Sequence, residues 1–403
     1  MGSRRKSFTN SPAIGCNHTN WMSWVDGDTK LTAMSLPGTH DSCSISFMPT
    51  GDKLLDEHVD YAKTQSADLR VQMTSGIRVL DIRCRPNKDR FDINHGDYWT
   101  GKDFNYVLDT VVNFVRSNPT EAVLMHVKKE SSPAPDSQSF EDIFTAYWND
   151  PKYHEYFWKN PNEDSTVEPT IPCLKDVRGK ILILQDFSSE TMFGPKWGGS
   201  QMNQQPSNKR NGLVTSKRDI HEKWKAVKEQ LDATSSGSTD VMYLNQLADN
   251  GMSALADPTK NIEFSDVPAI LVEGGFPTPE TIAGNLPPDS TVDNWYDFDA
   301  MIQKGIDAVA SGKEDKGINL STLEYIFKGY VNRTSVVMMD FPGRALIGAI
   351  IAHNMKFSTS RSKMDTDFNE IMEGIVHSCR GNGEDRCLRR GRDLPNFWER
   401  VHP

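Results

Sequence analysis

Short strand-like runs alternate with helix-like segments along most of this chain, and this alternation restricts the fold more than any other feature of the sequence. Apolar runs typical of strands cover residues 31–36, 76–83, 90–94, 122–127, 180–184, 241–244, 269–272 and 336–339. Apolar residues at helical spacing cover residues 104–116, 140–148, 220–231, 296–309, 323–330 and 345–352. Strands that alternate with helices form mostly parallel sheets, and seven or eight of them favour a closed (β/α) barrel over an open sheet.

The barrel is expected over residues 21–355, with less regular segments before, within and after it. Residues 1–20 are polar and predict a disordered lead-in. The stretch 249–293 contains six prolines and predicts an insertion at the rim of the barrel. Beyond residue 356 the chain is polar, with a basic cluster at 386–392, which predicts a C-terminal extension to residue 403.

Composition excludes several classes of protein. The chain has 403 residues, of which 37% are apolar and 25% charged, as in a soluble globular protein. A formal net charge of −10 argues against binding to nucleic acid and against simple electrostatic adsorption to anionic lipid. The apolar run at 345–352 is far shorter than the roughly 18 residues that a membrane-spanning helix needs. We expect a monomer that contacts membranes only transiently.

The cysteines and the N-terminus indicate an intracellular protein. The six cysteines are scattered, without the spacing of a metal site, and are expected to be buried thiols rather than a disulfide framework. The first residues lack the apolar core of a signal peptide. The sequence therefore predicts a cytoplasmic protein that is peripheral to the membrane.

Polar side chains capable of acid–base chemistry fall at or just past the ends of the predicted strands. They are His40, Asp81, Arg83, His95, Lys128 and Asp340. In a parallel barrel these strand ends meet at one mouth, where active sites lie. Two histidines, a fixed cation and several carboxylates are the groups needed to cleave a phosphodiester, because one proton must leave the attacking hydroxyl and another must reach the leaving oxygen.

Each of these residues has a chemical and a merely structural interpretation. His40 follows the bend Pro37–Gly38 and is either a general base, with Asp340 fixing its tautomer, or an incidental histidine in a turn. Asp81 and Arg83 share a strand face, since side chains alternate along a strand, and are either a structural ion pair or a phosphate-binding pair.

The second histidine suits the opposite role. His95 precedes Gly96, which allows close approach of the backbone to a ligand, and it could protonate the leaving oxygen while Asp41 orients it. Lys128 offers a second cation, although one lysine of the pair that it forms with Lys129 is expected to be solvated.

Other catalytic sites are less well supported. The chain has no nucleophile elbow, no phosphate-binding glycine loop with lysine, no zinc-protease helix motif and no dinucleotide-binding glycine motif. A metal site built from His40, Asp81 and His95 is a further alternative. Arg83 and Lys128 would place fixed positive charge where a divalent ion should sit, so we expect neither a metal nor another cofactor.

At these residues the chain resembles the X domain of phosphatidylinositol-specific phospholipase C, and it is more similar to the bacterial, metal-independent type than to the calcium-dependent animal enzymes. The matching segments are residues 35–42, 79–85, 95–96, 118–121, 127–130, 178–181 and 339–341. The resemblance implies a distorted TIM-type barrel. It also implies a lyase reaction in which the inositol 2-hydroxyl attacks phosphorus, giving diacylglycerol and inositol 1,2-cyclic phosphate.

The resemblance also implies roles for individual residues. His40 would be the general base with Asp340 behind it, and His95 the general acid with Asp41 as its partner. Arg83, supported by Asp81, would bind the phosphate. Acidic metal ligands of the calcium-dependent relatives are replaced here by Arg83 and Lys128, which implies that basic side chains take the place of the metal.

The head-group pocket departs from the family pattern. Asp186 occupies a position where the bacterial enzymes carry a basic residue that contacts inositol, and Ser216 and Arg218 stand where an aspartate and a tyrosine bind the ring. These positions lie in or beside the stretch 186–218, whose composition predicts a long loop. The alternatives are therefore a phosphodiesterase for another lipid head group, glycosylated or not built on inositol, or a catalytically silent lipid-binding module. Phe47–Met48 and Trp197 are candidate membrane contacts.

Overall fold

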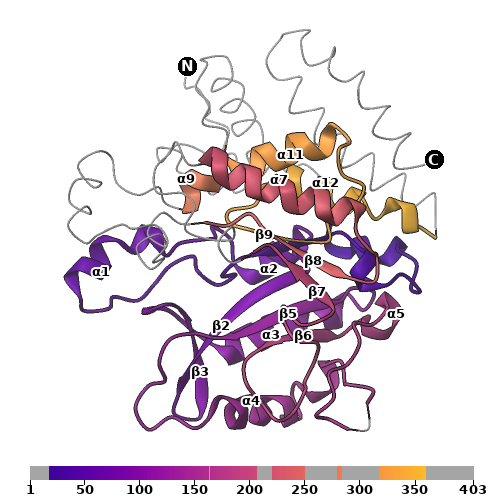
Figure 1. The fold of residues 1–403 in the computed structure, drawn as a ribbon. Coiled ribbons are helices and arrows are strands. Elements are labelled where there is room, and N and C mark those ends of the chain that lie inside the picture. The colour runs from indigo at the N-terminus through magenta and orange to yellow at the C-terminus, as the bar shows by residue number, and fades with distance from the viewer. Residues whose placement is uncertain (1–17, 163, 207–219, 250–278, 284–316, 360–403) are drawn as a thin grey trace, which may run out of the picture.

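The computed structural model describes residues 18–162, 164–206, 220–249, 279–283 and 317–359 (Figure 1). Nine strands of these residues form one sheet: β1 (Leu36–Thr39), β2 (Val79–Asn87), β3 (Arg90–His95), β4 (Tyr98–Asp103), β5 (Val123–Lys129), β6 (Ile181–Asp186), β7 (Met202–Gln204), β8 (Met242–Gln246) and β9 (Val336–Met339). The described α-helices are α1 (Lys53–Glu57), α2 (Leu69–Thr74), α3 (Phe104–Ser117), α4 (Phe140–Asn149), α5 (Leu174–Val177), α7 (Ile220–Ser236), α9 (Pro279–Ala283), α11 (Ile318–Phe327) and α12 (Arg344–Ala352).

Seven of the described strands run parallel in the order β6, β5, β2, β1, β9, β8, β7. Between β6 and β7, the described residues form no ladder, so hydrogen bonds do not close the ring of strands. The antiparallel hairpin β3–β4 extends from the far end of β2. Figure 1 shows α7, α11 and α12 together on one side of the sheet and α4 on the opposite side. The parallel strands therefore direct their carboxyl ends toward one mouth.

Helix α3 illustrates how the sequence sets an element of this fold. The Asp103 side chain accepts a hydrogen bond from the backbone N–H of Tyr106 and so caps the helix. Pro119 follows Asn118, the residue that caps the C-terminus of the helix, and prevents its continuation. The apolar positions at helical spacing are buried: Phe104, Val107, Leu108, Val111 and Val115. The predicted helix at 104–116 is confirmed.

The first predicted strand is displaced in the structure. Residues 31–33 form a 3₁₀ turn, and β1 begins only at Leu36. The Leu31 backbone N–H donates to the carbonyl of Pro172, outside the sheet, and the Leu31 side chain is fully buried. The apolar residues at 31–33 are therefore explained by their burial in the core and not by a strand.

Two described strands were not predicted. β4 (Tyr98–Asp103) is polar and contains Gly101, so it lacks the apolar run typical of a strand. Pairing with β3 forms it instead. β7 has three residues and lies within the stretch 186–218, predicted as a loop. The predicted strand at 269–272 and the helix at 296–309 lie outside the described residues, and the helix predicted at 323–330 begins earlier, at Ile318.

Two of the described thiols lie in the core, as predicted. Cys43 and Cys84 are buried and form no disulfide, and Cys173 is partly exposed. Burial raises the pKa of the Cys43 thiol to about 12, so this side chain is an unreactive thiol at neutral pH. No helix in the described ranges has the length and apolar character to cross a membrane.

A buried ion pair closes the amino-terminal end of the sheet. Arg78, immediately before β2, places Nη2 2.6 Å from Oε2 of Glu121, and both side chains are fully buried. The Arg78 guanidinium also donates to the carbonyls of His18, Thr19, Met73 and Ile77. This clamp joins the N-terminal 3₁₀ segment (His18–Trp24) to the strands at the end opposite the mouth.

Removing one partner of this clamp is expected to destabilise the fold. Glu121→Ala leaves the Arg78 guanidinium buried and unpaired, so we expect the free energy of unfolding to fall by about 3–5 kcal/mol. Lys30→Ala is the control, because Lys30 pairs with Asp240 on the exposed surface, where ion pairs contribute little. Urea unfolding followed by circular dichroism measures both variants, and equal losses would contradict the prediction.

Candidate active site

The residues predicted at strand ends lie close together on, or directly after, neighbouring strands. His40 directly follows β1, and Asp340 directly follows β9, its parallel neighbour. Asp81 and Arg83 lie on β2, the other neighbour of β1, and His95 ends β3. The topology therefore brings these five side chains to one mouth.

His40 is held between a carboxylate and a guanidinium. Its Nδ1 lies 2.9 Å from Oδ1 of Asp340, and its Nε2 lies 2.7 Å from Nη2 of Arg83. A guanidinium can only donate, so Nε2 must carry the lone pair and Nδ1 the proton that Asp340 accepts. This is the neutral tautomer in which the unprotonated Nε2 faces the Arg83 guanidinium. Burial lowers the pKa of His40, but Asp340 and Asp41 outweigh it and leave the pKa above the ordinary value of 6.5.

His95 has the opposite arrangement of contacts. Its Nδ1 lies 2.7 Å from the carbonyl oxygen of Ala62, which can only accept, so Nδ1 carries a proton. Its Nε2 lies 3.3 Å from Oδ2 of Asp41. A proton on that nitrogen would point toward a carboxylate. The two imidazole rings are perpendicular, with centroids 6.2 Å apart.

Asp41 lies between the two histidines. Its Oδ2 is 3.4 Å from Nε2 of His40 and 3.3 Å from Nε2 of His95. The side chain is buried, and burial raises its pKa despite the nearby Arg83 and histidines. Its backbone has a φ of +41°, and Phe341, which follows Asp340, has a φ of +43°. Two such left-handed residues other than glycine, each next to a strand end of the mouth, are typical of strain held at a functional site.

Arg83 supplies a fixed positive charge beside both histidines. Its Nε lies 2.7 Å from Oδ1 of Asp41 and 3.3 Å from Oδ2 of Asp81. Burial lowers the pKa of Arg83, but Asp41, Asp81 and Glu130 outweigh it, so the guanidinium remains charged. Burial raises the pKa of Asp81, yet Arg83 and His126 hold it well below its usual range.

One group of side chains has the spacing of a metal site. Ligand atoms of His40, Asp41 and Asp81 lie within 4.8 Å of one another. The Arg83 guanidinium already contacts all three residues. A divalent cation among these atoms would therefore have to displace a buried arginine, so this donor set does not fit a metal.

Sequence reasoning missed two charged residues of the mouth, His126 and Glu130. Both lie on or directly after β5, on the same face as Lys128, two residues to either side of it. Glu130 accepts from the backbone N–H of Gly96 and pairs with Lys128 at 3.2 Å. Their even spacing from Lys128 was the signal that could have identified them.

Of the residues expected at the head-group end, Lys128 and Asp186 lie at the mouth. Asp186 ends β6 in register with Lys128, but its Oδ2 lies 3.1 Å from Nε2 of His126. Trp197, a candidate membrane contact, stacks on His126 with ring centroids 4.0 Å apart. One face of its ring therefore packs against the site and is not available to lipid. Ser216 and Arg218 lie outside the described residues.

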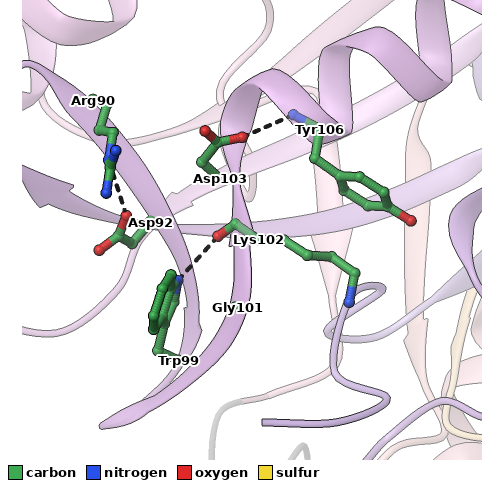
Figure 2. A pocket seen from close by; sticks show the side chains of 7 residues that line it. All are labelled: Arg90, Asp92, Trp99, Gly101, Lys102, Asp103 and Tyr106. Atoms are coloured by element: carbon green, nitrogen blue, oxygen red, sulfur yellow. Dashed lines mark hydrogen bonds and ion pairs between the residues drawn. The ribbon is translucent and has the colours of Figure 1, made fainter. Parts of the chain in front are cut away.

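A separate depression of about 300 Å³ lies on the hairpin β3–β4 (Figure 2). Its lining residues are Arg90, Asp92, Trp99, Gly101, Lys102, Asp103 and Tyr106. Trp99 faces Asn94 across the ladder, whereas His95 faces Tyr98, so the depression opens on the hairpin face opposite His95. The Asp103 carboxylate caps α3, and Arg90 pairs with Asp92. The depression is therefore not the site of the acid–base groups.

Two comparisons of sequence identify relatives of this chain. Residues 34–186 match the family described as phosphatidylinositol-specific phospholipase C, X domain. The 1-phosphatidylinositol phosphodiesterase of Listeria monocytogenes is 37% identical over 166 residues, which cover 41% of this chain and 48% of the relative. The protein of the same name from Staphylococcus aureus is 31% identical over 176 residues, covering 43% and 52%. The match thus spans about half the length of these curated relatives.

Solved structures extend the likeness of fold over more of the chain. The phosphatidylinositol-specific phospholipase C from Listeria monocytogenes has a TM-score of 0.57 at 23% identity, covering 84% of this chain and 98% of that one. A mutant of the enzyme from Staphylococcus aureus has a TM-score of 0.58 at 21% identity, covering 85% and 99%. These likenesses establish the fold alone, and they confirm the predicted distorted TIM-type α/β architecture. Residues 34–186 of this chain are therefore similar in sequence to the X domain of phosphatidylinositol-specific phospholipase C, within a fold of the same kind.

Proposed function

We propose that this protein cleaves phosphatidylinositol to diacylglycerol and inositol 1,2-cyclic phosphate without a metal ion. One observation supports this function above the others. The Nε2 atoms of His40 and His95 approach the same carboxylate oxygen of Asp41, with the Arg83 guanidinium beside them. A base, an acid and a phosphate-binding cation thus share one mouth, as phosphodiester cleavage requires.

The proposed reaction begins at His40. Its unprotonated Nε2 removes the proton from the inositol 2-hydroxyl, whose oxygen attacks phosphorus, while Asp340 stabilises the imidazolium that forms. Arg83 stabilises the charge that grows on the phosphate oxygens. As the P–O bond to diacylglycerol breaks, His95 delivers its Nε2 proton to the leaving oxygen. The nucleophile belongs to the substrate, so proximity supplies much of the rate.

Phosphorus NMR of phosphatidylinositol vesicles tests this function. In the presence of EDTA we expect the phosphodiester signal to be replaced by that of a five-membered cyclic phosphate. Turnover that requires added calcium would overturn metal independence. Absence of turnover with any phosphoinositide, together with retained lipid binding, would support the silent binding module instead.

Cleavage of a lipid with a different head group is the second candidate. The position where the bacterial enzymes would place a basic residue against inositol is here the acidic Asp186, which binds His126. In this version Lys128, Asp186, Ser216 and Arg218 contact a head group such as a glycosylated inositol. Release of cyclic phosphate from a glycosylated inositol lipid, but not from phosphatidylinositol, would favour it.

The remaining expectations are proposals of the same kind. The chain would act as a monomer that contacts the membrane peripherally from the cytoplasm. Its barrel would span residues 21–355, including the insertion at 249–293, between the lead-in at 1–20 and the extension at 356–403.

Apolar side chains on the hairpin β3–β4 and on the segment that packs against it would mediate membrane contact. Met48 and Trp99 are 48% and 36% exposed, and the Met48 backbone N–H donates to the carbonyl of Trp99. Removing both in Met48→Ser/Trp99→Ser should weaken binding to phosphatidylinositol vesicles by roughly tenfold, because burial of each side chain in lipid contributes free energy. Val167→Ser, which removes another exposed apolar side chain, is the matched control. Vesicle sedimentation measures binding, and an equal effect of the control would contradict the assignment.

A further inference from the structure

His126 lies at the centre of a second charged cluster, next to the proposed catalytic groups. Its Nδ1 is 2.9 Å from Oδ1 of Asp81, and its Nε2 is 3.1 Å from Oδ2 of Asp186. Only 4% of its surface is exposed, and the Trp197 ring covers one face of the imidazole at a centroid distance of 4.0 Å and an angle of 18°. Three elements therefore fix a histidine to which the proposed reaction assigns no step.

Two carboxylates favour the charged form of this imidazole. A neutral imidazole has one N–H, so its other nitrogen would direct a lone pair at a carboxylate. The imidazolium instead places its positive charge between Asp81 and Asp186. Burial lowers the pKa of His126, but the two carboxylates outweigh it and raise the pKa above its ordinary value.

Asp81 connects this cluster to the reacting groups. Its Oδ2 accepts from Nε of Arg83 at 3.3 Å and from the backbone N–H of Asp41 at 3.0 Å. His126 contacts the other oxygen, Oδ1. The orientation of this carboxylate is thus set from both sides. Loss of the His126 contact would allow Asp81 to rotate away from Arg83.

Asp186 connects the cluster to the open part of the mouth. Its side chain is 39% exposed, and it lies in register with Lys128 on β5, which in turn lies in register with Arg83 on β2. A substrate hydroxyl that approaches Asp186 would therefore meet a carboxylate whose other contact is His126.

We propose that His126 is a positioning residue, which as an imidazolium holds Asp81 against Arg83 and links the head-group end of the site at Asp186 to the phosphate-binding cation. The proposal rests on the proposed function and deepens it, because it assigns this chain a buried charge that acts through Asp81. His126 would touch neither the substrate nor the reacting atoms.

The charged groups around His126 determine how its role depends on pH. Asp81 and Arg83 face it from β2, Lys128 from its own strand and Asp186 from β6, while His40 lies beyond Asp81. The raised pKa means that His126 is charged at low pH and loses its proton as the pH rises through that pKa. Its contribution to kcat should therefore be complete on the acidic side and disappear on the alkaline side.

His126→Gln, compared with wild type across a pH series, tests the proposal. Below about pH 6.5, the ordinary pKa of histidine, we expect kcat on phosphatidylinositol to fall roughly tenfold with KM nearly unchanged, as for partners that orient a reacting group. The wild-type to variant ratio should approach one at alkaline pH, where wild-type His126 is itself neutral. A ratio that is constant with pH, or a change in KM alone, would overturn the proposal.

A buried histidine elsewhere provides the matched control. His353 is 2% exposed, and its ring nitrogens face the carbonyls of Ala349 and Val331 rather than carboxylates. Burial lowers its pKa to about 4, so it is neutral at working pH. His353→Gln should alter stability without a pH-dependent change in kcat. The same pH-dependent ratio in this variant would contradict the role of His126.

A nitrogen-15 NMR titration of His126 separates failure of this inference from failure of the proposed function. We expect both ring nitrogens of the wild-type protein to be protonated at about pH 6.5, and Asp186→Asn to lower the pKa of His126 by removing one of its two carboxylates. A neutral His126 at that pH would overturn the inference, whether or not the protein turns over lipid. A charged His126 in a protein that cleaves no phosphoinositide would refute only the proposed function.

Discussion

His40→Ala should lower kcat on phosphatidylinositol by about 10²–10⁴, the usual contribution of a general base. The reason lies in the hydrogen bonds of this residue. Nδ1 donates to Asp340 while Nε2 offers a lone pair beside Arg83, and no other described side chain has that arrangement at the mouth. His154→Ala removes an exposed histidine after α4 and should leave kcat unchanged. Turnover of His40→Ala close to wild type would end the assignment of this residue as the base.

The pH dependence gives the same assignment a second test. His40 acts as a base only when neutral, so activity should be lost as the pH falls through its pKa, which lies above 6.5. Asp340 raises that pKa, and Asp340→Asn should therefore move the acidic limb of kcat/KM toward lower pH while lowering the maximal rate. An acidic limb that moves toward higher pH in Asp340→Asn would contradict this account.

Arg83→Lys should reduce kcat by about 10²–10³, the range found when one donor that stabilises a developing oxyanion is removed. Lysine keeps the charge but lacks the planar fork that lets Arg83 contact Asp41, Asp81 and His40 at once. The carboxylates of Asp41 and Asp81 would then repel the phosphate. We expect the loss in kcat rather than in KM, because charge on the phosphate oxygens grows in the transition state.

Arg85→Lys is the matched control for this change. Arg85 lies two residues further along β2 and donates to the carbonyl of Ser132 rather than to the carboxylates of the mouth. Its replacement should leave kcat within about twofold of wild type, as for a substitution outside the site. An equal loss of kcat in the two variants would contradict a specific role for the Arg83 guanidinium.

The parts of the site that sequence could predict are those governed by strand ends. His40 and Asp340 directly follow the parallel neighbours β1 and β9. His95 ends β3, which runs antiparallel to β2 and so returns toward them. The chemistry of these residue types then restricts their roles. The carboxyl ends of parallel strands are a robust guide because backbone pairing, rather than side-chain detail, determines their position.

The parts that sequence could not predict depend on contacts between side chains from different strands. His126 lies inside the β5 sequence Val-Leu-Met-His-Val-Lys-Lys, where a single polar residue resembles an ordinary core histidine. Only the register of β5 with β2 and β6 reveals that it faces Asp81 and adjoins Asp186. The strand β4 was not predicted for a related reason, because its structure is determined by pairing with β3 and not by an apolar sequence pattern.

The central claim is that His40 and His95 divide proton removal and proton delivery between them, and a change of leaving group tests it most directly. On an inositol phosphate ester with an acidic phenol as leaving group, departure needs no proton, so His95→Ala should recover most of its lost rate whereas His40→Ala should not. The measured quantity is kcat of each variant relative to wild type, on this ester and on phosphatidylinositol. Equal rescue of both variants, or rescue of His40→Ala alone, would contradict the account.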